Sequence, residues 1–437
     1  MNFQEACEEA RRVALSFNEP LIVHHHDCDG ITSGAIVVSA FLAAGKKFRR
    51  ECIKKLDDAV IERYRNEREL IFVDIGGGHK RVNELCDVVI IDHHQTEGIK
   101  KLQVNPMLYG INGGEELSAA GTAYLVFGER VELAITGAVG DMQWPLRGKN
   151  REILADGINK GLVRTENDLR FYGRYSRPLI QFLEYSDEPY IPGISYREDK
   201  AAALLTTLGI PIKKGEEYRR YVDLTKEEKI RLASALAEIL VERGRIASLD
   251  ELIGESYVFP KNKMNETYEA SEFSTLLNAC GRHARDDIGI RVALGDEGCF
   301  QGARSLLQLH RRMLKEGIEF ARGNIQDFGA FFFLDGRKKI DEAIIGTICG
   351  MVLEQRWKKP IVGIASSDEG GIKASARGRG VNLGLIMRKA AEIAHGVGGG
   401  HRIAAGASFP ADKLNEFLLA VGKELREDCK IRQVPNY

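Results

Sequence analysis

Short apolar runs alternate with longer helical patterns through about the first 185 residues of the chain. Leu21–Val23, Leu70–Val73 and Val88–Ile91 are apolar and mostly β-branched, which is typical of strands buried on both faces of a sheet. Residues Ile31–Ala44, between the first two runs, are small and apolar and stop at Gly45, as expected of a crossover helix. The pattern therefore predicts an α/β domain built on a parallel sheet.

Helical patterns continue into the middle of the chain. Ser118–Phe127 and Glu132–Val139 are predicted helices, and prolines at Pro189, Pro192 and Pro211 then mark a break. We expect residues 190–290 to be mainly helical. The clearest element there is a helix over Lys226–Glu242, which Thr225 and Glu228 begin in capping-box spacing.

The last third of the chain has the pattern of a second, smaller α/β domain. Its predicted elements are a helix over Gly302–Ala321, a strand over Ala330–Leu334, a helix over Ile344–Glu354, a strand over Ile361–Ala365, a strand-like segment over Lys373–Arg379 and a helix ending at His395. We therefore predict three parts with boundaries at 1–189, 190–290 and 291–437, within an overall α/β fold class.

Composition limits the classes of protein that fit. The 437 residues carry a formal net charge of -1, which argues against a generally basic protein that coats DNA. The eight cysteines include no C-x-x-C pair, which favours reduced thiols in the cytoplasm over a disulfide framework. No secretory signal and no membrane-length apolar run is visible, so we expect no membrane association.

Acids and histidines gather where the three predicted strands end. They are His25–Asp29, Asp74 and Asp92–His94. Because parallel strands present their carboxyl ends at one edge of a sheet, residues far apart in the sequence can meet there. If the first strand stays extended, alternation places His25, Asp27 and Asp29 on one side.

This residue set predicts a site for two divalent cations. Asp74 is the acid positioned to bridge two cations about 4 Å apart, and Asp141 can join the second. Carboxylates suit Mg²⁺ and Mn²⁺, and the imidazoles shift the preference toward Mn²⁺. Such a pair polarises water and neutralises charge on a phosphoryl group, so phosphoester hydrolysis is the expected chemistry. The alternative for Asp74 or Asp141 taken alone is a helix cap.

A second group of residues is predicted to bind phosphate. Backbone amides can approach an anion closely at Gly398, Gly399 and Gly400, and His401 follows them with a donor side chain. The alternative to phosphate binding is that these glycines form a simple tight turn. Ser375, Arg377 and Arg379 alternate along the preceding strand-like segment, so both arginines are expected on one face. Arg174 and Arg177 are further candidates for substrate contact, and Tyr109, Phe171 and Tyr172 are candidates for base stacking.

These motifs resemble those of the DHH phosphoesterase superfamily. The residues that carry the resemblance are His25-x-Asp27-x-Asp29-Gly30, Asp74, Asp92-His93-His94 and Gly137-x-x-x-Asp141, with Gly398–His401 and Ala404–Gly406 resembling the associated DHHA1 domain. Gly173–Pro178 and Glu272–Arg282 are similar to archaeal RecJ-like nucleases. The resemblance implies an N-terminal DHH domain, a helical middle insertion and a C-terminal DHHA1 domain across a cleft from the metals.

The resemblance also implies a role for each site residue. His25, Asp27 and Asp74 would hold one Mn²⁺, and Asp29, Asp74, His93 and Asp141 the other. Asp92 would orient the metal shell, and His94 would contact the phosphate or leaving oxygen. DHHA1-like Ser375, Arg377, Arg379, Gly398–Gly400 and His401 would grip the substrate.

The expected activity is that of a Mn²⁺-dependent exonuclease, with Mg²⁺ as the alternative ion. It would digest single-stranded DNA, and RNA as a further substrate, from the 5′ end to mononucleotides in DNA replication or repair. One alternative is an oligoribonuclease or a phosphodiesterase for cyclic dinucleotides, and another is a non-catalytic scaffold in a replication complex. In archaeal relatives the middle region resembles the part that meets replication-helicase proteins of the GINS complex, which makes GINS an expected partner.

Overall fold

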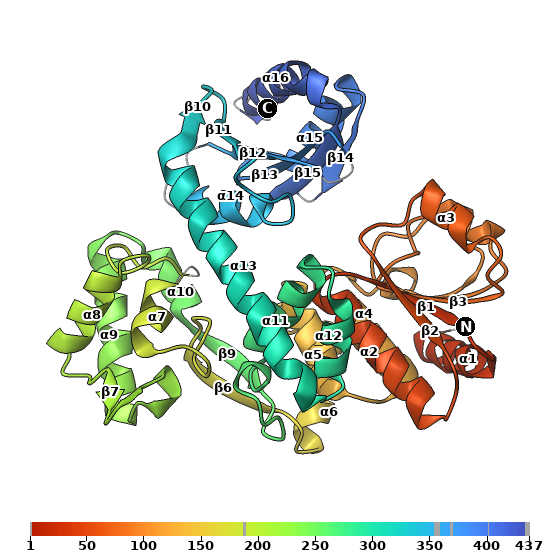
Figure 1. Cartoon of the computed structure of the whole chain (residues 1–437), viewed down its shortest axis with the longest axis horizontal. Helices are drawn as coiled ribbons and strands as arrows, with labels where there is room; N and C mark the ends of the chain where they lie inside the picture. The colour runs from red at the N-terminus through yellow and green to blue at the C-terminus, as the bar shows by residue number, and fades with distance from the viewer. Residues whose placement is uncertain (1, 187–188, 354–358, 368–369, 401, 433–437) are drawn as a thin grey trace, which may run out of the picture. The chain divides into compact units, whose positions relative to one another are not determined.

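The computed structural model describes residues 2–186, 189–353, 359–367, 370–400 and 402–432. The chain divides into two compact units, Met1–Leu307 and Gln308–Tyr437 (Figure 1). None of the helices in the described ranges combines the length and the apolar character that crossing a bilayer requires.

The first unit is built on a five-stranded sheet. Its strands are β1 (Leu21–His25), β2 (Arg49–Ile53), β3 (Glu69–Val73), β4 (Asp87–Ile91) and β5 (Leu102–Val104), in the order β2-β1-β3-β4-β5. Every neighbouring pair is parallel, which confirms the predicted parallel sheet. The two edge strands, β2 and β5, were not predicted.

Alternate residues of the central strands enter two different cores. Ile22, Ile71 and Val89 pack in one core against the helices on that face, and Leu21, Leu70 and Val88 pack in the other. The helices of the first core include α1 (Phe3–Ser16), α2 (Cys28–Ala43), α4 (Ala119–Phe127), α5 (Val131–Gly140) and α6 (Gly148–Asn159), and α3 (Asp58–Tyr64) covers the other face. Strands buried on both faces explain the continuous apolar runs in the sequence.

The middle of the chain forms its own small core, as a largely helical region. It contains β6 (Arg164–Leu169), α7 (Leu179–Glu184), α8 (Glu198–Thr207), β7 (Lys213–Lys214), β8 (Glu217–Tyr218), α9 (Lys226–Glu242), α10 (Leu249–Leu252) and β9 (Ile253–Val258). The predicted helix over Lys226–Glu242 is confirmed, and the Thr225–Glu228 capping box is formed. After β9 the chain returns to the first core through α11 (Ala270–Arg282) and α12 (Asp286–Ala293), which pack on α2 and α5.

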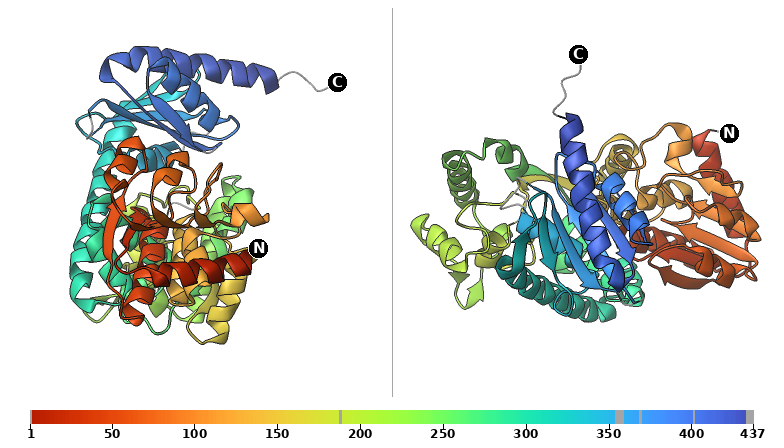
Figure 2. Two further views of the ribbon diagram at one scale, coloured as in Figure 1. Left: turned by 90° about the vertical axis from the view of Figure 1, so that its right-hand side faces the viewer. Right: turned by 90° about the horizontal axis from the view of Figure 1, so that it is seen from above.

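The second unit contains a six-stranded mixed sheet, reached through the long helix α13 (Glu297–Asn324). Its strands are β10 (Ile325–Asp327), β11 (Phe332–Asp335), β12 (Ile361–Ser366), β13 (Ile372–Arg377), β14 (Val397–Gly400) and β15 (Ala404–Phe409), in the order β10-β11-β12-β13-β15-β14. The helices are α14 (Ile345–Leu353), α15 (Leu383–Ile393) and α16 (Leu414–Arg432). α15 and α16 cover one face of the sheet (Figure 2), and α14 packs on β12 and β13.

Two sequence-based interpretations of this unit were wrong: the alternative of a tight turn at the glycines, and the placement of both arginines on one strand face. Gly398–Gly400 lies in β14, an edge strand, and does not form a tight turn. The φ of Gly400 is 132°, a value that glycine adopts much more readily than other residues, so the backbone of this strand requires glycine at that position. Arg379 lies beyond the end of β13, so strand alternation does not place it on the same face as Arg377. His401 lies outside the described residues.

Candidate metal centre

The first acid–histidine cluster sits at the turn from β1 into α2. β1 ends at His25, Asp27 is the N-cap of α2 and its Oδ1 accepts a hydrogen bond of 3.0 Å from the Gly30 N–H. Asp29 lies in the first turn of the helix. The expectation of an extended strand end through Asp29 was therefore wrong, because the helix begins earlier than its apolar pattern. His25 and Asp27 join one group of donors, and Asp29 joins another.

Asp29 is held by the start of α4. Its carboxylate accepts hydrogen bonds from the N–H groups of Ala119, at 2.8 Å, and Ala120, at 2.9 Å. N–H groups at a helix N-terminus have no partner within the helix, and together they favour a negative charge. A side chain at Gly137 of α5 would lie only 2.4 Å from Asp29 Oδ1. The glycine of the Gly137-x-x-x-Asp141 motif thus leaves room for this carboxylate.

Asp74 lies between the two groups of donors, directly after β3. Its Oδ2 is 3.4 Å from His25 Nδ1, and its Oδ1 is 3.3 Å from His93 Nε2. Both oxygens are buried and have no hydrogen-bond partner among the described residues. The backbone of Asp74 has a φ of 59°, in the left-handed region that residues other than glycine adopt only uncommonly. Two oxygens facing two donor groups is the arrangement of a bridging carboxylate.

The Asp92-His93-His94 triplet is ordered by Asp92, which is buried at the end of β4. Its Oδ2 accepts a hydrogen bond of 2.8 Å from the Gly77 N–H, and its Oδ1 accepts one of 2.8 Å from the His93 N–H. His94 Nδ1 lies 2.8 Å from the same Oδ1, and the His94 side chain is 55% exposed. Asp92 therefore orients both histidines while its own oxygens are already occupied.

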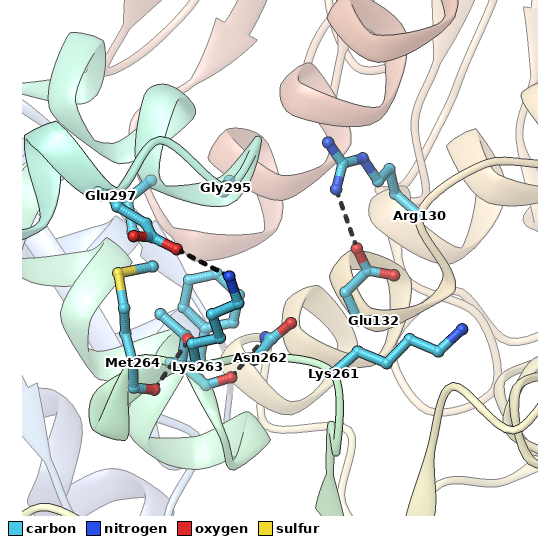
Figure 3. A pocket seen from close by; sticks show the side chains of 12 residues that line it. Arg130, Glu132, Lys261, Asn262, Lys263, Met264, Gly295 and Glu297 are labelled. Atoms are coloured by element: carbon cyan, nitrogen blue, oxygen red, sulfur yellow. Dashed lines mark hydrogen bonds and ion pairs between the residues drawn. The ribbon is translucent and has the colours of Figure 1, made fainter.

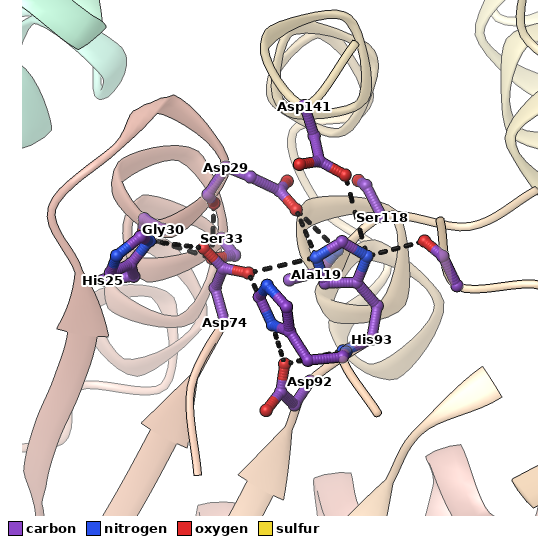
Figure 4. A network of polar contacts seen from close by, with 12 residues as sticks. His25, Asp29, Gly30, Ser33, Asp74, Asp92, His93, Ser118, Ala119 and Asp141 are labelled. Atoms are coloured by element: carbon purple, nitrogen blue, oxygen red, sulfur yellow. Dashed lines mark hydrogen bonds and ion pairs between the residues drawn. The ribbon is translucent and has the colours of Figure 1, made fainter. Parts of the chain in front are cut away.

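His93 presents one ring nitrogen to the centre. Its Nδ1 is 2.6 Å from the carbonyl oxygen of Gly113, so Nδ1 carries the proton and Nε2 keeps its lone pair. Nε2 is buried without a hydrogen bond among the described residues and faces Asp74 and Asp29. Asp141, at the C-terminus of α5, places Oδ2 3.8 Å from His93 Nδ1. Figure 4 shows His25, Asp29, Asp74, His93 and Asp141 converging from separate elements.

The charges of the cluster shift its pKa values strongly. Burial, and then the charge of Asp74, raise the pKa of Asp29 well above its usual range. Burial alone would lower the pKa of His93, but the carboxylates of Asp74, Asp29 and Asp141 raise it well above normal. Burial alone would lower the pKa of His94, but the hydrogen bond to Asp92 and the charge of Asp92 raise it to about 9. Without cations, the cluster keeps protons to balance its buried acids.

The donor set fits divalent cations. Four atoms, Asp74 Oδ1, Asp74 Oδ2, His25 Nδ1 and His93 Nε2, are buried and lack hydrogen bonds among the described residues, a costly state for polar atoms. Carboxylate oxygens with a minority of imidazoles suit Mn²⁺ or Mg²⁺. Two donor groups lie within reach of one ion each: His25, Asp27 and Asp74, and Asp29, His93 and Asp141. His94 also lies within reach of Asp74 and His93.

The sequence did not reveal the residues that support this centre. Gln143 is buried and donates from Nε2 to Asp141 Oδ2 at 2.8 Å. Asn278 of α11 accepts a hydrogen bond of 3.0 Å from the Cys28 N–H. Neither has a distinctive spacing from the ligands, because their contacts arise only in the fold. The Glu272–Arg282 segment that resembles RecJ-like proteins did contain Asn278.

The predicted phosphate-binding residues lie in the second unit. Ser375 and Arg377 are on the face of β13 that packs against α14, where a side chain at Gly346 would meet both. Ser375 is buried, and Arg377 is partly buried and donates from Nη1 to the carbonyl of Ala376 at 2.9 Å. Burial lowers the pKa of Arg377. Arg377 is thus constrained by its own strand, unlike a flexible surface arginine.

Two of the other substrate-contact candidates have structural roles. Arg174 is 3% exposed, forms an ion pair with Glu166 at 3.4 Å and donates to Ser256, so it ties β6 to β9. Phe171 is buried in the core of the middle region. Arg177 lies over the ring of Tyr172, 4.4 Å from its centroid. The expectation that Arg174 and Phe171 meet substrate was therefore wrong.

A separate hollow lies in the first unit (Figure 3). It is lined by Arg130, Glu132, Lys261, Asn262, Lys263, Met264, Thr267, Phe273, Val292, Ala293, Gly295 and Glu297. Arg130 pairs with Glu132 at 3.4 Å, and Lys263 with Glu297 at 3.6 Å. These two ion pairs neutralise four of the five charged side chains in the lining, Lys261 being the fifth, and none of the predicted metal ligands contributes to it. The metal centre remains the candidate functional site.

Comparison with protein families finds three domains in the chain. Residues 20–141 match the N-terminal domain of the DHH family, residues 171–253 match the DHH-CID domain, and residues 328–427 match the DHHA1 domain. These matches cover every predicted metal ligand and the described substrate-binding candidates of the second unit.

Known proteins resemble the chain along most of its length. An uncharacterized protein of Methanocaldococcus jannaschii is 29% identical over 462 residues, covering 98% of this chain and 99% of that protein. RecJ of Thermus thermophilus with Mn²⁺ has a TM-score of 0.62 and 16% identity over 97% of this chain, which spans only 55% of that protein. Cdc45 of Entamoeba histolytica has a TM-score of 0.66 and 14% identity, covering 97% of this chain and 98% of that one. The structural likenesses establish a RecJ-like fold.

Proposed function

Because the chain belongs to the DHH/DHHA1 superfamily of phosphoesterases, we propose that it is a Mn²⁺-dependent exonuclease. Its proposed substrate is single-stranded DNA, with RNA as a further substrate, digested from the 5′ end to mononucleotides in DNA replication or repair. Mg²⁺ is the alternative ion. A RecJ solved with manganese has the same fold, with a TM-score of 0.60 over 99% of this chain, which supports the choice of Mn²⁺.

One observation carries this proposal: Asp74 presents its two buried oxygens to two different donor groups. Oδ2 faces His25, which pairs with Asp27, and Oδ1 faces His93, which lies near Asp29 and Asp141. We assign His25, Asp27 and Asp74 to one cation, and Asp29, Asp74, His93 and Asp141 to the other. A pair of cations bound there supplies a polarised water and neutralises charge on the phosphoryl group.

The protein's own residues do the positioning. The α4 N-terminus fixes Asp29, the Gly113 carbonyl fixes the tautomer of His93, and Asp92 orients the His93–His94 segment. His94, more exposed than His93 and anchored through Nδ1, is proposed to contact a phosphate or leaving oxygen. Ser375, Arg377, Arg379, Gly398–Gly400 and His401 are proposed to bind the substrate backbone, and Arg377 supplies a pre-positioned guanidinium for a phosphate.

Product analysis tests the activity. The purified protein with Mn²⁺ is given a long single strand labelled at either end, as DNA and as RNA, beside a dinucleotide and an EDTA control. Mononucleotides released from the 5′ end of the long DNA strand are expected. Cleavage of the dinucleotide alone would favour the alternative, a phosphodiesterase for short oligoribonucleotides or cyclic dinucleotides.

A scaffold without catalysis is the alternative from another class, and the likeness to Cdc45 over 97% of this chain is the observation in its favour. The orphaned atoms of the metal centre argue for catalysis. His93→Ala provides the test, because it removes the Nε2 donor while leaving the Asp92 contacts of the backbone. Loss of all turnover with nucleic-acid binding retained is expected, whereas the absence of turnover in the wild-type protein would favour the scaffold.

The middle region is proposed to bind GINS. Its helix α9 exposes Ile230 at 57% and Val241 at 51%, an apolar exposure that the core of this region does not need. Copurification of the chain with GINS is expected, and Ile230→Asp with Val241→Asp should remove it. Leu419→Asp, on an exposed position of α16, is the matched control, and a complex that survives the α9 changes would contradict the proposal.

A further inference from the structure

A buried pair of side-chain amides lies behind one half of the metal centre. Gln143, which is 3% exposed, follows the C-terminus of α5, and Asn150, which is 2% exposed, lies in the first turn of α6. Asn150 Nδ2 donates to Gln143 Oε1 at 2.6 Å. Gln143 Nε2 donates at 2.7 Å to the Gly113 carbonyl and at 2.8 Å to Asp141 Oδ2.

The chemistry of these partners fixes the orientation of both amides. A carbonyl and a carboxylate only accept, so the Gln143 amide group must turn its nitrogen toward Gly113 and Asp141. Its oxygen then faces Asn150, which must donate. The remaining Asn150 Oδ1 lies 3.4 Å from the Ser118 N–H, at the start of α4. A flip of either amide would place like groups against each other.

The contacts of this pair lead to three predicted ligands. Gln143 holds Asp141 directly, and it shares the Gly113 carbonyl with His93 Nδ1, which lies 2.6 Å from that oxygen. Asn150 contacts Ser118, the N-cap of α4, whose next two N–H groups hold Asp29. Asp29, His93 and Asp141 are also one of the groups whose donor atoms lie within reach of a single ion.

We propose that Gln143 and Asn150 are positioning residues for one of the two cations, the one assigned to Asp29, His93 and Asp141. This inference rests on the proposed function, because it assumes that the centre binds two cations. Among the described residues, the pair makes no hydrogen bond to His25 or to Asp27, whose carboxylate is held by the Gly30 N–H. The pair therefore acts on one cation site and leaves the other unchanged.

The physical reason is the exposure of Asp141. Its side chain is 31% exposed at a helix end, so without Gln143 the carboxylate could turn toward solvent. The Gly113 carbonyl would lose one of its two hydrogen-bond donors and keep only the His93 N–H, so the orientation of the His93 ring would be fixed less well. Removing such an outer partner of a metal ligand typically lowers metal affinity by about 10- to 100-fold.

Mn²⁺ titration of Gln143→Leu tests the inference without relying on turnover. The full-length variant and the wild-type protein are titrated by calorimetry, and their electron paramagnetic resonance spectra are recorded. The wild-type protein is expected to bind two ions and give the spectrum of an exchange-coupled pair. The variant should keep one ion at wild-type affinity, bind the second about 10- to 100-fold more weakly, and give the spectrum of an uncoupled ion.

Two further variants guard against a general effect on folding. Leu154→Ala removes a fully buried side chain from α6 without touching the amide pair, and it should lower the melting temperature while keeping both ions. Asn150→Ala should weaken the same single site as Gln143→Leu, by a smaller factor. Two ions at unchanged affinity in Gln143→Leu would overturn the inference alone. A wild-type protein that binds no Mn²⁺ would overturn the proposed metal centre, and the inference with it.

Discussion

Asp74 combines two features of the metal centre that are energetically unfavourable. Its φ of 59° is unfavourable for an aspartate, and its two oxygens are buried without hydrogen bonds among the described residues. Asp29 and Asp141 add like charge nearby, which is one reason why the pKa of each of these two acids is raised, after burial itself. Under the proposed function, cations bound at the centre would offset this cost.

Asp74→Asn should therefore stabilise the metal-free protein and abolish its stabilisation by Mn²⁺. Asparagine adopts positive φ at least as readily as aspartate, so the backbone can stay as it is, while one buried carboxylate is removed. We expect the melting temperature in EDTA to rise by about 2 °C, equivalent to roughly 1 kcal/mol. Differential scanning calorimetry with EDTA and with Mn²⁺ measures both effects, and a variant still stabilised by Mn²⁺ would contradict the bridging role.

Glu272 is a second buried acid, outside the metal centre, at the start of α11. Its Oε1 accepts a hydrogen bond of 2.9 Å from the Tyr175 N–H, and its Oε2 has no hydrogen-bond partner among the described residues. Burial, and then the charge of Glu269, raise the pKa of Glu272 from 4.5 to about 7, although the hydrogen bond from the Tyr175 N–H and the charge of Arg177 oppose the shift. Between these values the folded protein holds a proton that the unfolded chain releases.

Stability should therefore fall as the pH rises from about 4.5 through about 7, because the folded state binds more protons there. Glu272→Gln removes this loss and keeps an oxygen for the Tyr175 N–H. Relative to the wild-type protein, it should gain on the order of 2 kcal/mol more at pH 8 than at pH 5. Urea unfolding of both proteins in EDTA checks this, and an equal difference at the two pH values would refute it.

At the scale of elements, α11 supports the corner where β1 turns into α2. Asn278 binds the Cys28 N–H, and a side chain at Gly281 would lie only 1.6 Å from the His26 carbonyl oxygen. The helix thus approaches the backbone between two predicted ligands, His25 and Asp27, about as closely as atoms allow. This contact gives a physical reason for the asparagine and glycine of the Glu272–Arg282 segment.

Gly281→Ala should displace α11 and disturb this corner. Overpacking against rigid backbone costs about 1–3 kcal/mol, so the melting temperature should fall by several degrees, and Mn²⁺ should bind more weakly. Gly302→Ala in α13 is the matched control, because its added carbon would meet only the flexible end of Ile288, at 3.3 Å. The control should change stability by less than about 1 kcal/mol. Equal melting temperatures for the two variants would contradict the close approach.

Elements with a strong local pattern were predicted well, and elements defined by tertiary contacts were not. α9 was predicted from Lys226 to Glu242 because both its cap and its apolar spacing are local. β2 reads Arg49-Arg50-Glu51-Cys52-Ile53 and lies at a sheet edge, where polar residues are tolerated and hide the strand. β5 is three residues long and lies at the other edge. The start of α2 was missed because its first turn carries Asp29, where an apolar residue would have signalled the helix.

The candidate site shows the same division between local and tertiary information. The convergence of His25, Asp74 and His93 could be predicted because each lies at or just after the end of an apolar strand, and parallel strands share an edge. Gln143 and Asn150 could not, because their partners come from distant segments and a buried amide has no sequence pattern of its own. Arg174 was misjudged for a related reason, since only the fold reveals the Glu166 and Ser256 that surround it.

At the scale of the whole molecule, the predicted metal ligands and the predicted phosphate-binding residues lie in different units of the chain. His25, Asp74 and Asp141 belong to Met1–Leu307, and Ser375 and Arg377 belong to Gln308–Tyr437. Each unit has a hydrophobic core of its own. Under the proposed function, changes in the first unit should affect the chemical step, and changes in the second should affect binding.

Arg377→Ala should then weaken binding of single-stranded DNA while turnover at saturating substrate stays near the wild-type value. If Arg377 neutralises one phosphate, its loss should reduce the slope of log affinity against log salt by about 0.7. Asp27→Ala should do the opposite, abolishing turnover with an unchanged salt slope. Fluorescence anisotropy over a salt series, paired with steady-state kinetics, separates the two effects.

Because Arg377 is partly buried against α14, Arg377→Lys serves as the control: it keeps the charge, so the slope should stay at the wild-type value even where affinity falls. A slope unaffected by Arg377→Ala would place the substrate backbone elsewhere on the second unit.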